Sequence, residues 1–147
     1  MNWIIGVMDV MESKIHQIEV RTWEGEGYKP LVSHRDWLVA LMNWESRFDL
    51  SGIGKVERHN ETDEVFVLQK GRSILFICNQ EGIPVIDMQP GVLYNVTRGT
   101  WHNVVGTRET QWLIVESNDT SEENSDYRDL ENDELAALRS QFPSWLK

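Results

Sequence analysis

Short apolar stretches, broken at close intervals by turn residues, dominate the middle of this chain. Between residues 53 and 117 these stretches are IGKVERH, EVFVLQ, SILFIC, PVIDM, VLYNV, TWHNVV and QWLIVES, separated by Gly, Asn, Asp or Pro. Each has the length of a strand and is too short for most helices. Regular short strands with this punctuation predict an antiparallel sandwich or barrel, so the expected fold class is all-β.

The N-terminal third is less regular. The stretch WLVALMNW at 37–44 is strongly apolar between polar neighbours, which favours a core strand buried on both faces. Before it, IHQIEV at 15–20 is predicted to be a strand, and the Gly and Pro residues of EGEGYKP at 24–30 predict a loop. Residues 1–36 are therefore interpreted as an N-terminal strand arm.

The chain changes character at Asn118, where NDTSEENSDYRD is polar and acidic. This composition predicts a surface loop or an extended flank. Further on, Leu135, Leu138 and Phe142 recur at spacings of three and four, and Asn132 precedes them as a candidate cap. We therefore expect one short amphipathic C-terminal helix.

The length of 147 residues corresponds to about one domain, with a core barrel at 37–117, the arm at 1–36 and the tail and helix at 118–147. No stretch approaches the about 20 consecutive apolar residues of a membrane helix. The apolar N-terminal stretch is short, has no leading positive charge and is soon followed by acidic residues, unlike a signal peptide. We expect a soluble cytoplasmic protein with no membrane partner.

Charge and cysteine content narrow the function classes. The net charge of -10, with only 14 Lys and Arg residues, argues against nucleic acid as a partner, because that affinity depends on basic side chains. The single cysteine, Cys78, lies in ILFIC and cannot form an intramolecular disulfide. It is interpreted as a buried small hydrophobic residue in a protein from a reducing compartment.

Two stretches concentrate side chains that can bind a metal, namely ERHNETDEVFVLQKG at 57–71 and GVLYNVTRGTWHNVVG at 91–106. They contain Glu57, His59, Glu64 and His102, a set of ligand types that divalent metals select. Because side chains alternate along a strand, Lys55 shares a face with Glu57 and His59. Charged groups on an inward face need partners or a metal, so these residues predict a polar pocket that takes a small-molecule ligand.

Other interpretations of this cluster remain open. Glu57, Glu61, Asp63 and Glu64 would form a solvated acidic hairpin if both histidines were satisfied by hydrogen bonds elsewhere. The same side chains would also suit a ligand pocket without a metal. Lys55 is an ordinary surface lysine unless its face is the interior one.

Both stretches resemble the paired motifs of the cupin superfamily, GX5HXHX4EX6G and GX5PXGX2HX3N. Six positions match at the family spacing: His59, Glu64, Gly71, Gly91, Gly99 and His102. Four positions differ: Ser51, next to Gly52, stands for the first Gly, Glu57 for the first His, Thr97 for the Pro, and Gly106 for the Asn.

The resemblance implies a small antiparallel β-barrel of the double-stranded β-helix or jelly-roll type, with a divalent ion in its mouth. Its implied ligands are Glu57, His59, Glu64 and His102. A carboxylate at Glu57 in place of an imidazole adds a negative charge and a harder donor, so manganese, iron, nickel or zinc is expected. A homodimer is expected, because open barrels have strand edges to cover.

The triplet Glu57-Arg58-His59, with the elements that follow it, is also similar to ureidoglycolate lyase. The further matching elements are Phe66, Leu68, Pro90, Gly91, Gly99, Trp101 and His102. This likeness implies lyase or hydrolase chemistry that releases urea and glyoxylate.

The same likeness implies roles for the pocket residues. Glu57, His59 and His102 are the implied acid, base and metal-binding groups, and Lys55 is the implied partner of the substrate carboxylate. Tyr94 is an implied pocket residue, with a core or interface tyrosine as the alternative. Two other functions stay open: a non-catalytic cupin that binds a small ligand, and an interaction protein with a collapsed cavity.

Overall fold

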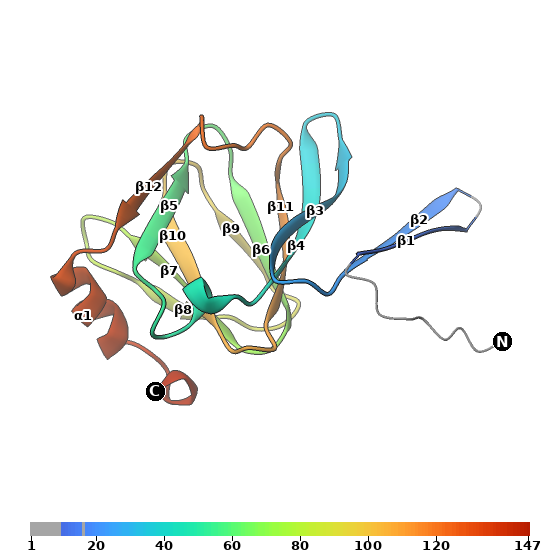
Figure 1. Ribbon diagram of the computed structural model, residues 1–147. Helices are drawn as coiled ribbons and strands as arrows, with labels where there is room; N and C mark the ends of the chain where they lie inside the picture. The colour runs from blue at the N-terminus through green and yellow to red at the C-terminus, as the bar shows by residue number, and fades with distance from the viewer. Residues whose placement is uncertain (1–9, 16) are drawn as a thin grey trace.

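The protein is described by a computed structural model at residues 10–15 and 17–147. Two five-stranded antiparallel sheets face each other and form a barrel (Figure 1). One sheet has the order β3 (Gly27–His34), β4 (Trp37–Asn43), β11 (Gln111–Ser117), β6 (Glu64–Lys70) and β9 (Leu93–Val96). The other has the order β12 (Ser125–Asp129), β5 (Lys55–His59), β10 (Trp101–Gly106), β7 (Ser73–Cys78) and β8 (Val85–Asp87). The predicted all-β barrel is confirmed.

Alternating side chains build the core of the barrel. In β11 the inward-facing Trp112 and Ile114 are buried in a cluster that fills the space between the sheets. Strand β7 is buried on both faces, with Leu75 in this inner cluster and Phe76 in a second cluster on the outside of its sheet. Cys78 lies in the outer cluster as a free, buried thiol, as its apolar neighbours predicted.

Strand β4 confirms the core strand predicted at 37–44, but its burial alternates. Leu38, Ala40 and Met42 are buried between the sheets, whereas the residues between them are only half-buried. The prediction of burial on both faces is wrong for this strand, because no helix covers the outer face of its sheet among the described residues (Figure 1). An antiparallel sheet tolerates one solvated face.

The predicted N-terminal arm contains a two-stranded hairpin, β1 (Val10–Ile15) and β2 (Ile18–Trp23), which extends away from the barrel in Figure 1. Residues 1–9 and 16 of the predicted arm lie outside the described residues. The loop predicted at 24–30 is wrong from Gly27 onward, because β3 begins there and pairs with β4. Its Pro30 is tolerated because β3 is an edge strand with a register shift at that point.

The acidic tail also contains a strand that the sequence did not predict. Strand β12 pairs with β5, placing Asp126 opposite Arg58 and Asp129 opposite Lys55. Both pairs form ion pairs, at 2.7 and 2.6 Å. The polar composition that predicted a loop is therefore that of a charged edge strand whose opposite charges face each other.

The C-terminal helix is confirmed as α1 (Asn132–Ser140), which lies over the outer face of the β5 sheet (Figure 1). Its buried Leu138 packs in the outer cluster with Phe142. The cap is Glu131 rather than the predicted Asn132, and the Glu134 carboxylate accepts the Glu131 N–H at 2.9 Å. None of the described helices is long and apolar enough to span a membrane.

Candidate functional site

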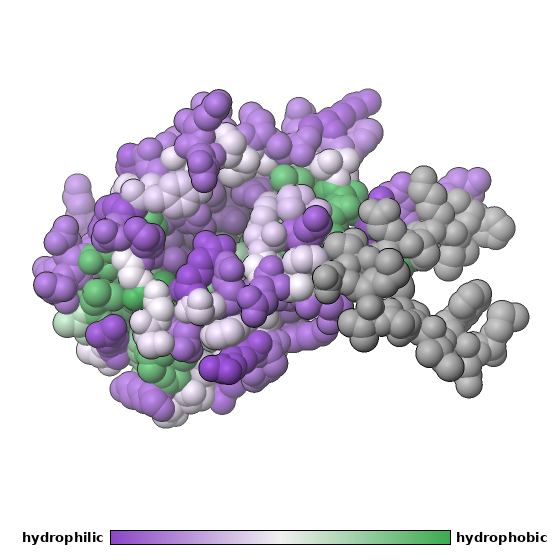
Figure 2. Space-filling model, in the orientation of Figure 1, coloured by the Kyte–Doolittle hydropathy of each residue, from purple (hydrophilic) through white to green (hydrophobic). Residues whose placement is uncertain are grey.

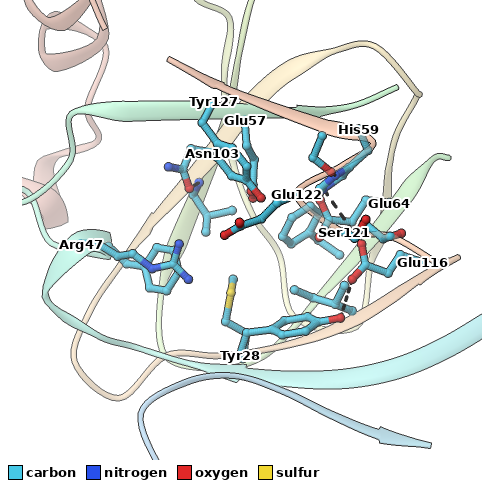
Figure 3. Close-up of a pocket in the computed structure, with 17 residues that line it drawn as sticks. Tyr28, Arg47, Glu57, His59, Glu64, Asn103, Glu116, Ser121, Glu122 and Tyr127 are labelled. Carbon is cyan, nitrogen blue, oxygen red and sulfur yellow. Dashed lines mark hydrogen bonds and ion pairs between the residues drawn. The ribbon is translucent and has the colours of Figure 1, made fainter. Parts of the chain in front are cut away.

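The two motif stretches meet at one end of the barrel, around a cavity of about 270 Å³ between the sheets (Figure 3). Figure 2 shows hydrophilic side chains lining a recess on this face of the molecule. One ligand atom from each of Glu57, His59, Glu64 and His102 lies within 4.8 Å of the other three. The sequence prediction that these four side chains converge therefore matches the structure.

The strands position each member of this four-residue cluster. Glu57 and His59 lie on the inner face of β5, and the sheet register places His102 of β10 directly opposite Glu57. Glu64 is the first residue of β6 in the facing sheet. Because the four side chains come from three strands of a packed barrel, their arrangement is set by the core and not by a mobile loop.

Glu64 is the centre of the cluster. Its Oε2 atom lies 2.8 Å from His102 Nε2 and 3.1 Å from His59 Nε2. The carboxylate and His102 are almost fully buried, at 4% and 1% exposure. Burial raises the pKa of Glu64, whereas the hydrogen bonds from His102 and His59 lower it. The hydrogen bonds have the larger combined effect, so the pKa of Glu64 lies below its ordinary value.

The far nitrogen of each imidazole is also bound. His102 Nδ1 lies 2.8 Å from the Thr100 carbonyl oxygen, which can only accept, so Nδ1 carries a proton. His59 Nδ1 lies 2.8 Å from Ser125 Oγ. Both rings therefore present Nε2 to the cluster, which is the way that histidine ligands of metals are oriented. Burial lowers the pKa of both histidines, but the bond to Glu64 outweighs it and the net direction is up.

Glu57 differs from the other three members. Its carboxylate has no hydrogen-bond partner among the residues that the structure describes. Burial raises its pKa, and the charge of Glu64 raises it further. A half-buried carboxylate beside a second carboxylate, without a hydrogen bond, is a group that a cation would stabilise.

The donor set therefore fits a divalent metal. Two imidazole nitrogens and two carboxylate oxygens converge, and the bonds at Nδ1 fix the orientation of both rings. Metal binding would release the protons that the histidines share with Glu64. The solvated-hairpin interpretation is wrong for Glu64, which is buried, although Glu61 and Asp63 are exposed. The collapsed-cavity interpretation is wrong as well, because the cavity reaches the cluster.

Two predicted substrate-binding residues lie outside this cavity. Lys55 Nζ forms its ion pair with Asp129, and 70% of the lysine side chain is exposed. The Tyr94 hydroxyl accepts the Gln89 N–H at 2.8 Å, and its ring packs against the core between the sheets. Lys55 shares a strand face with Glu57 and His59, but it is the first residue of β5 and lies beyond the cluster. Its side chain therefore does not line this cavity.

The structure adds a carboxylate that the sequence analysis missed. Glu116 in β11 lies with its Oε2 4.0 Å from His59 Nε2 and accepts a hydrogen bond from the Tyr28 hydroxyl (Figure 3). Burial, with the nearby charge of Glu64, raises the pKa of Glu116 to about 7. A signal for it exists in QWLIVES, because alternation from the buried Trp112 and Ile114 places Glu116 inward.

The cavity mouth is built largely from segments that the sequence analysis predicted as loops or left unassigned. Tyr28 comes from the stretch predicted as a loop at 24–30, and Arg47 from the short 3₁₀ helix Ser46–Phe48. The acidic tail supplies further lining residues: Thr120, Ser121, Glu122, Ser125 and Tyr127. Their polarity suits solvated loops equally well, so composition alone did not identify them.

Comparison with known proteins supports the fold. No protein-family model and no curated protein sequence matches the chain. Among solved structures, Streptomyces Pac13 with uridine has a TM-score of 0.54 at 9% identity, over 88% of this chain and 93% of its own. Pac13 is described as a β-barrel nucleoside dehydratase.

Two further structures align over a smaller part of the chain. A cupin-2 domain protein from Shewanella frigidimarina has a TM-score of 0.47 at 22% identity, over 65% of this chain and 85% of its own. KdgF from Halomonas sp. has a TM-score of 0.49 at 12% identity, over 65% of this chain and 81% of its own. None of the three is described as a ureidoglycolate lyase. With two facing antiparallel sheets and converging motif residues, the chain has a cupin-type β-barrel fold.

Proposed function

We propose that this protein is a small-molecule lyase that works with a divalent metal held by Glu57, His59, Glu64 and His102. The observation that carries the proposal is the buried convergence of two Nε2 atoms on one carboxylate oxygen, beside the Glu57 carboxylate, which has no hydrogen bond to any described residue. The mixed nitrogen and oxygen donors favour manganese, iron, nickel or zinc. When bound, the metal would polarise a substrate oxygen.

Glu116 is the acid and base of the proposed reaction. It lies beside the cluster without belonging to it, with its Oε2 4.0 Å from His59 Nε2, and burial raises its pKa to about 7 in the metal-free protein, the direction that suits a group that takes up and returns a proton. The Tyr28 hydroxyl donates to this carboxylate and holds it against the cavity wall. Ser125 and Thr100 keep the imidazoles of the metal ligands in place, so proton transfer falls to Glu116.

Ureidoglycolate is the specific substrate proposed. Its cleavage removes the proton of the C–OH group, breaks the C–N bond and protonates the departing nitrogen, which yields glyoxylate and urea without oxidation or reduction. One carboxyl group in reach of both atoms would suffice for these two transfers, and we assign that role to Glu116 because it lies beside the cluster. Pac13, which shares the fold, is described as a dehydratase, and dehydration is also an elimination.

The proposal is tested with purified protein, by measuring bound metal and then glyoxylate released from ureidoglycolate above the rate without protein. We expect one metal per chain and turnover in the wild type, no metal and no turnover in His59→Ala, and metal without turnover in Glu116→Gln. Glu123→Gln, an exposed glutamate outside the cavity lining, is the charge-matched control.

The outcomes separate the functions. Protein without metal after loading rejects the metal centre. Full metal content without glyoxylate rejects ureidoglycolate as the substrate. If metal-loaded protein binds ureidoglycolate and returns it unchanged, the non-catalytic ligand-binding function replaces the enzyme.

A further inference from the structure

A second cavity of about 370 Å³ adjoins the one that contains the cluster. The two share four lining residues, Arg47, Glu57, Asn103 and Tyr127, which lie where the cavities adjoin. We call the cavity with the cluster the inner chamber and the second cavity the outer chamber. A ligand that occupies both chambers would therefore contact these four residues.

The two chambers differ in charge. The inner chamber is lined by four carboxylates, Glu57, Glu64, Glu116 and Glu122, and by one cation, Arg47. The outer chamber contains both Arg47 and Lys55, with Asp129 and Glu57 as its acids. Because Lys55 is already paired with Asp129 at 2.6 Å, Arg47 is the cation that a ligand would meet.

Arg47 is positioned to bind an anion. Its Nε donates to the Glu45 carboxylate, and its guanidinium lies 4.4 Å from the centre of the Phe48 ring. Among the described residues Glu45 is its only hydrogen-bond partner, which leaves the two terminal nitrogens for a ligand. Figure 3 shows the guanidinium on the side of the inner chamber, and Arg47 lines the outer chamber as well. Two parallel N–H groups match the geometry of a carboxylate.

Two glycines shape the outer chamber around Arg47. A Cβ atom at Gly52 would lie 2.0 Å from the Ser46 carbonyl oxygen, so only glycine lets the short helix that carries Arg47 pack there. A Cβ atom at Gly54 would meet nothing within 4 Å, because it would point into open space. One glycine thus positions the arginine, and the other leaves the chamber open.

We propose that the outer chamber binds the distal carboxylate of a ligand longer than ureidoglycolate through Arg47, while the other end of that ligand lies beside the cluster in the inner chamber. This inference rests on the proposed function for the role of the inner chamber. It goes beyond that function, because it assigns a second binding site and requires two polar ends in the ligand. A compound with one carboxylate next to its reacting carbon, such as ureidoglycolate, leaves the outer chamber empty.

Two matched probes test the proposal. Both 2-hydroxyglutarate and 2-hydroxybutyrate present a hydroxy acid to the metal, and only the former has a distal carboxylate. Calorimetry on manganese-loaded and on chelator-treated protein gives the affinity ratio of the two probes. In the wild type we expect 2-hydroxyglutarate to bind about 10–100-fold more tightly, the range of a charge-assisted hydrogen-bonded pair.

Variants assign this preference to Arg47 and to the outer chamber. Arg47→Gln is expected to bring the ratio close to one with little change for 2-hydroxybutyrate. Gly54→Phe should do the same by filling the chamber, and Gly54→Ala should have a smaller effect. Arg98→Gln, which removes an exposed cation outside both chambers, is the charge-matched control.

The inference is overturned by equal affinities in the wild type, by a ratio that survives both Arg47→Gln and Gly54→Phe, or by no binding of either probe. Metal content, measured on the same samples, reports separately on the proposed function. A probe preference that depends on Arg47 in protein that takes up no manganese on loading would support the anion site and reject the metal centre.

Discussion

His102 in β10 lies directly opposite Glu57 in β5, in the antiparallel pairing of the two strands. This pairing joins the second motif to the first, because it places the motif histidine beside the residue that stands in the first His position. A shift of one residue would turn either side chain to the other face of the sheet. Glu57 therefore belongs to the cluster through the register of the sheet, and a change of its side chain would act directly on a metal bound there.

Replacement of Glu57 should alter metal binding in two directions. Glu57→Gln removes a charged ligand and is expected to weaken manganese binding by about 100-fold or more, since changes outside the ligand shell alone cost about 10–100-fold. Glu57→His restores the residue of the family motif and should shift preference from manganese toward nickel or zinc, because imidazole suits those ions. Metal content after dialysis against an equimolar mixture measures both effects.

Glu61→Gln is the control for these variants, because Glu61 is an exposed glutamate in the turn between β5 and β6. It should bind metals as the wild type does. Identical metal content in Glu57→Gln and Glu61→Gln would mean that Glu57 is not a ligand.

Ser125→Ala tests the outer support of the cluster. Ser125 Oγ lies 2.8 Å from His59 Nδ1, so its loss frees the ring to rotate and leaves a buried nitrogen without its partner. Metal affinity should fall by about 10–100-fold, as for other residues that orient histidine ligands. Calorimetric titration with manganese measures the change. Ser140→Ala, at the end of α1, is the control. Equal manganese affinities for the Ser125→Ala and Ser140→Ala variants would argue against the orienting role of Ser125.

The sequence predicted the barrel because its strands either alternate between apolar and polar residues or are apolar throughout. Both patterns can be recognised in a single sequence. Strand β7 is the clearest case, since every residue of SILFIC except Ile77 is buried. Strand β12 was not predictable in this way. It pairs with β5, where Asp126 lies opposite Arg58 and Asp129 opposite Lys55, and the residues of β12 alone do not reveal this partner strand.

The candidate site, like the fold, was predictable from the sequence only in part. Motif spacing located four side chains that converge, and their positions follow from register within the two stretches. Glu116, Tyr28 and Arg47 were missed because they reach the cavity from other elements, and their approach depends on how the two sheets pack. Lys55 was placed in the pocket by alternation alone, which fixes the face of a side chain but not its depth along the barrel.

Tyr28→Phe should raise the pKa of Glu116 in the metal-free protein. Burial already raises that pKa to about 7, and the Tyr28 hydroxyl opposes it by donating to the ionised carboxylate. Without the donor, the ionised form loses stabilisation of about 1–2 kcal/mol, so that more of Glu116 is protonated at pH 7. Carboxyl carbon NMR across pH measures the titration. Tyr94→Phe is the control, and an unchanged or lowered pKa in Tyr28→Phe would contradict this account.

The contact between Arg128 and Glu134 should make the attachment of α1 depend on pH. Arg128 binds both carboxylate oxygens of Glu134, at 2.7 and 2.8 Å, which joins β12 to the first turn of α1. The hydrogen bond from Arg128 lowers the pKa of Glu134 below its ordinary 4.5. A lowered carboxyl pKa stabilises the folded protein above the unfolded pKa, and this stabilisation disappears as pH falls through the folded one.

Glu134→Gln is therefore expected to lower the free energy of unfolding at pH 7 by about 0.5–1 kcal/mol, the scale of a partly exposed ion pair. Urea denaturation of variant and wild type at several pH values measures this difference, and other groups that titrate affect both proteins alike. The difference should shrink below pH 4.5 as the wild-type carboxyl is protonated. Glu123→Gln controls for the loss of one negative charge. A difference that stays constant at low pH would mean that the Glu134 side chain stabilises α1 by packing and not by its charge.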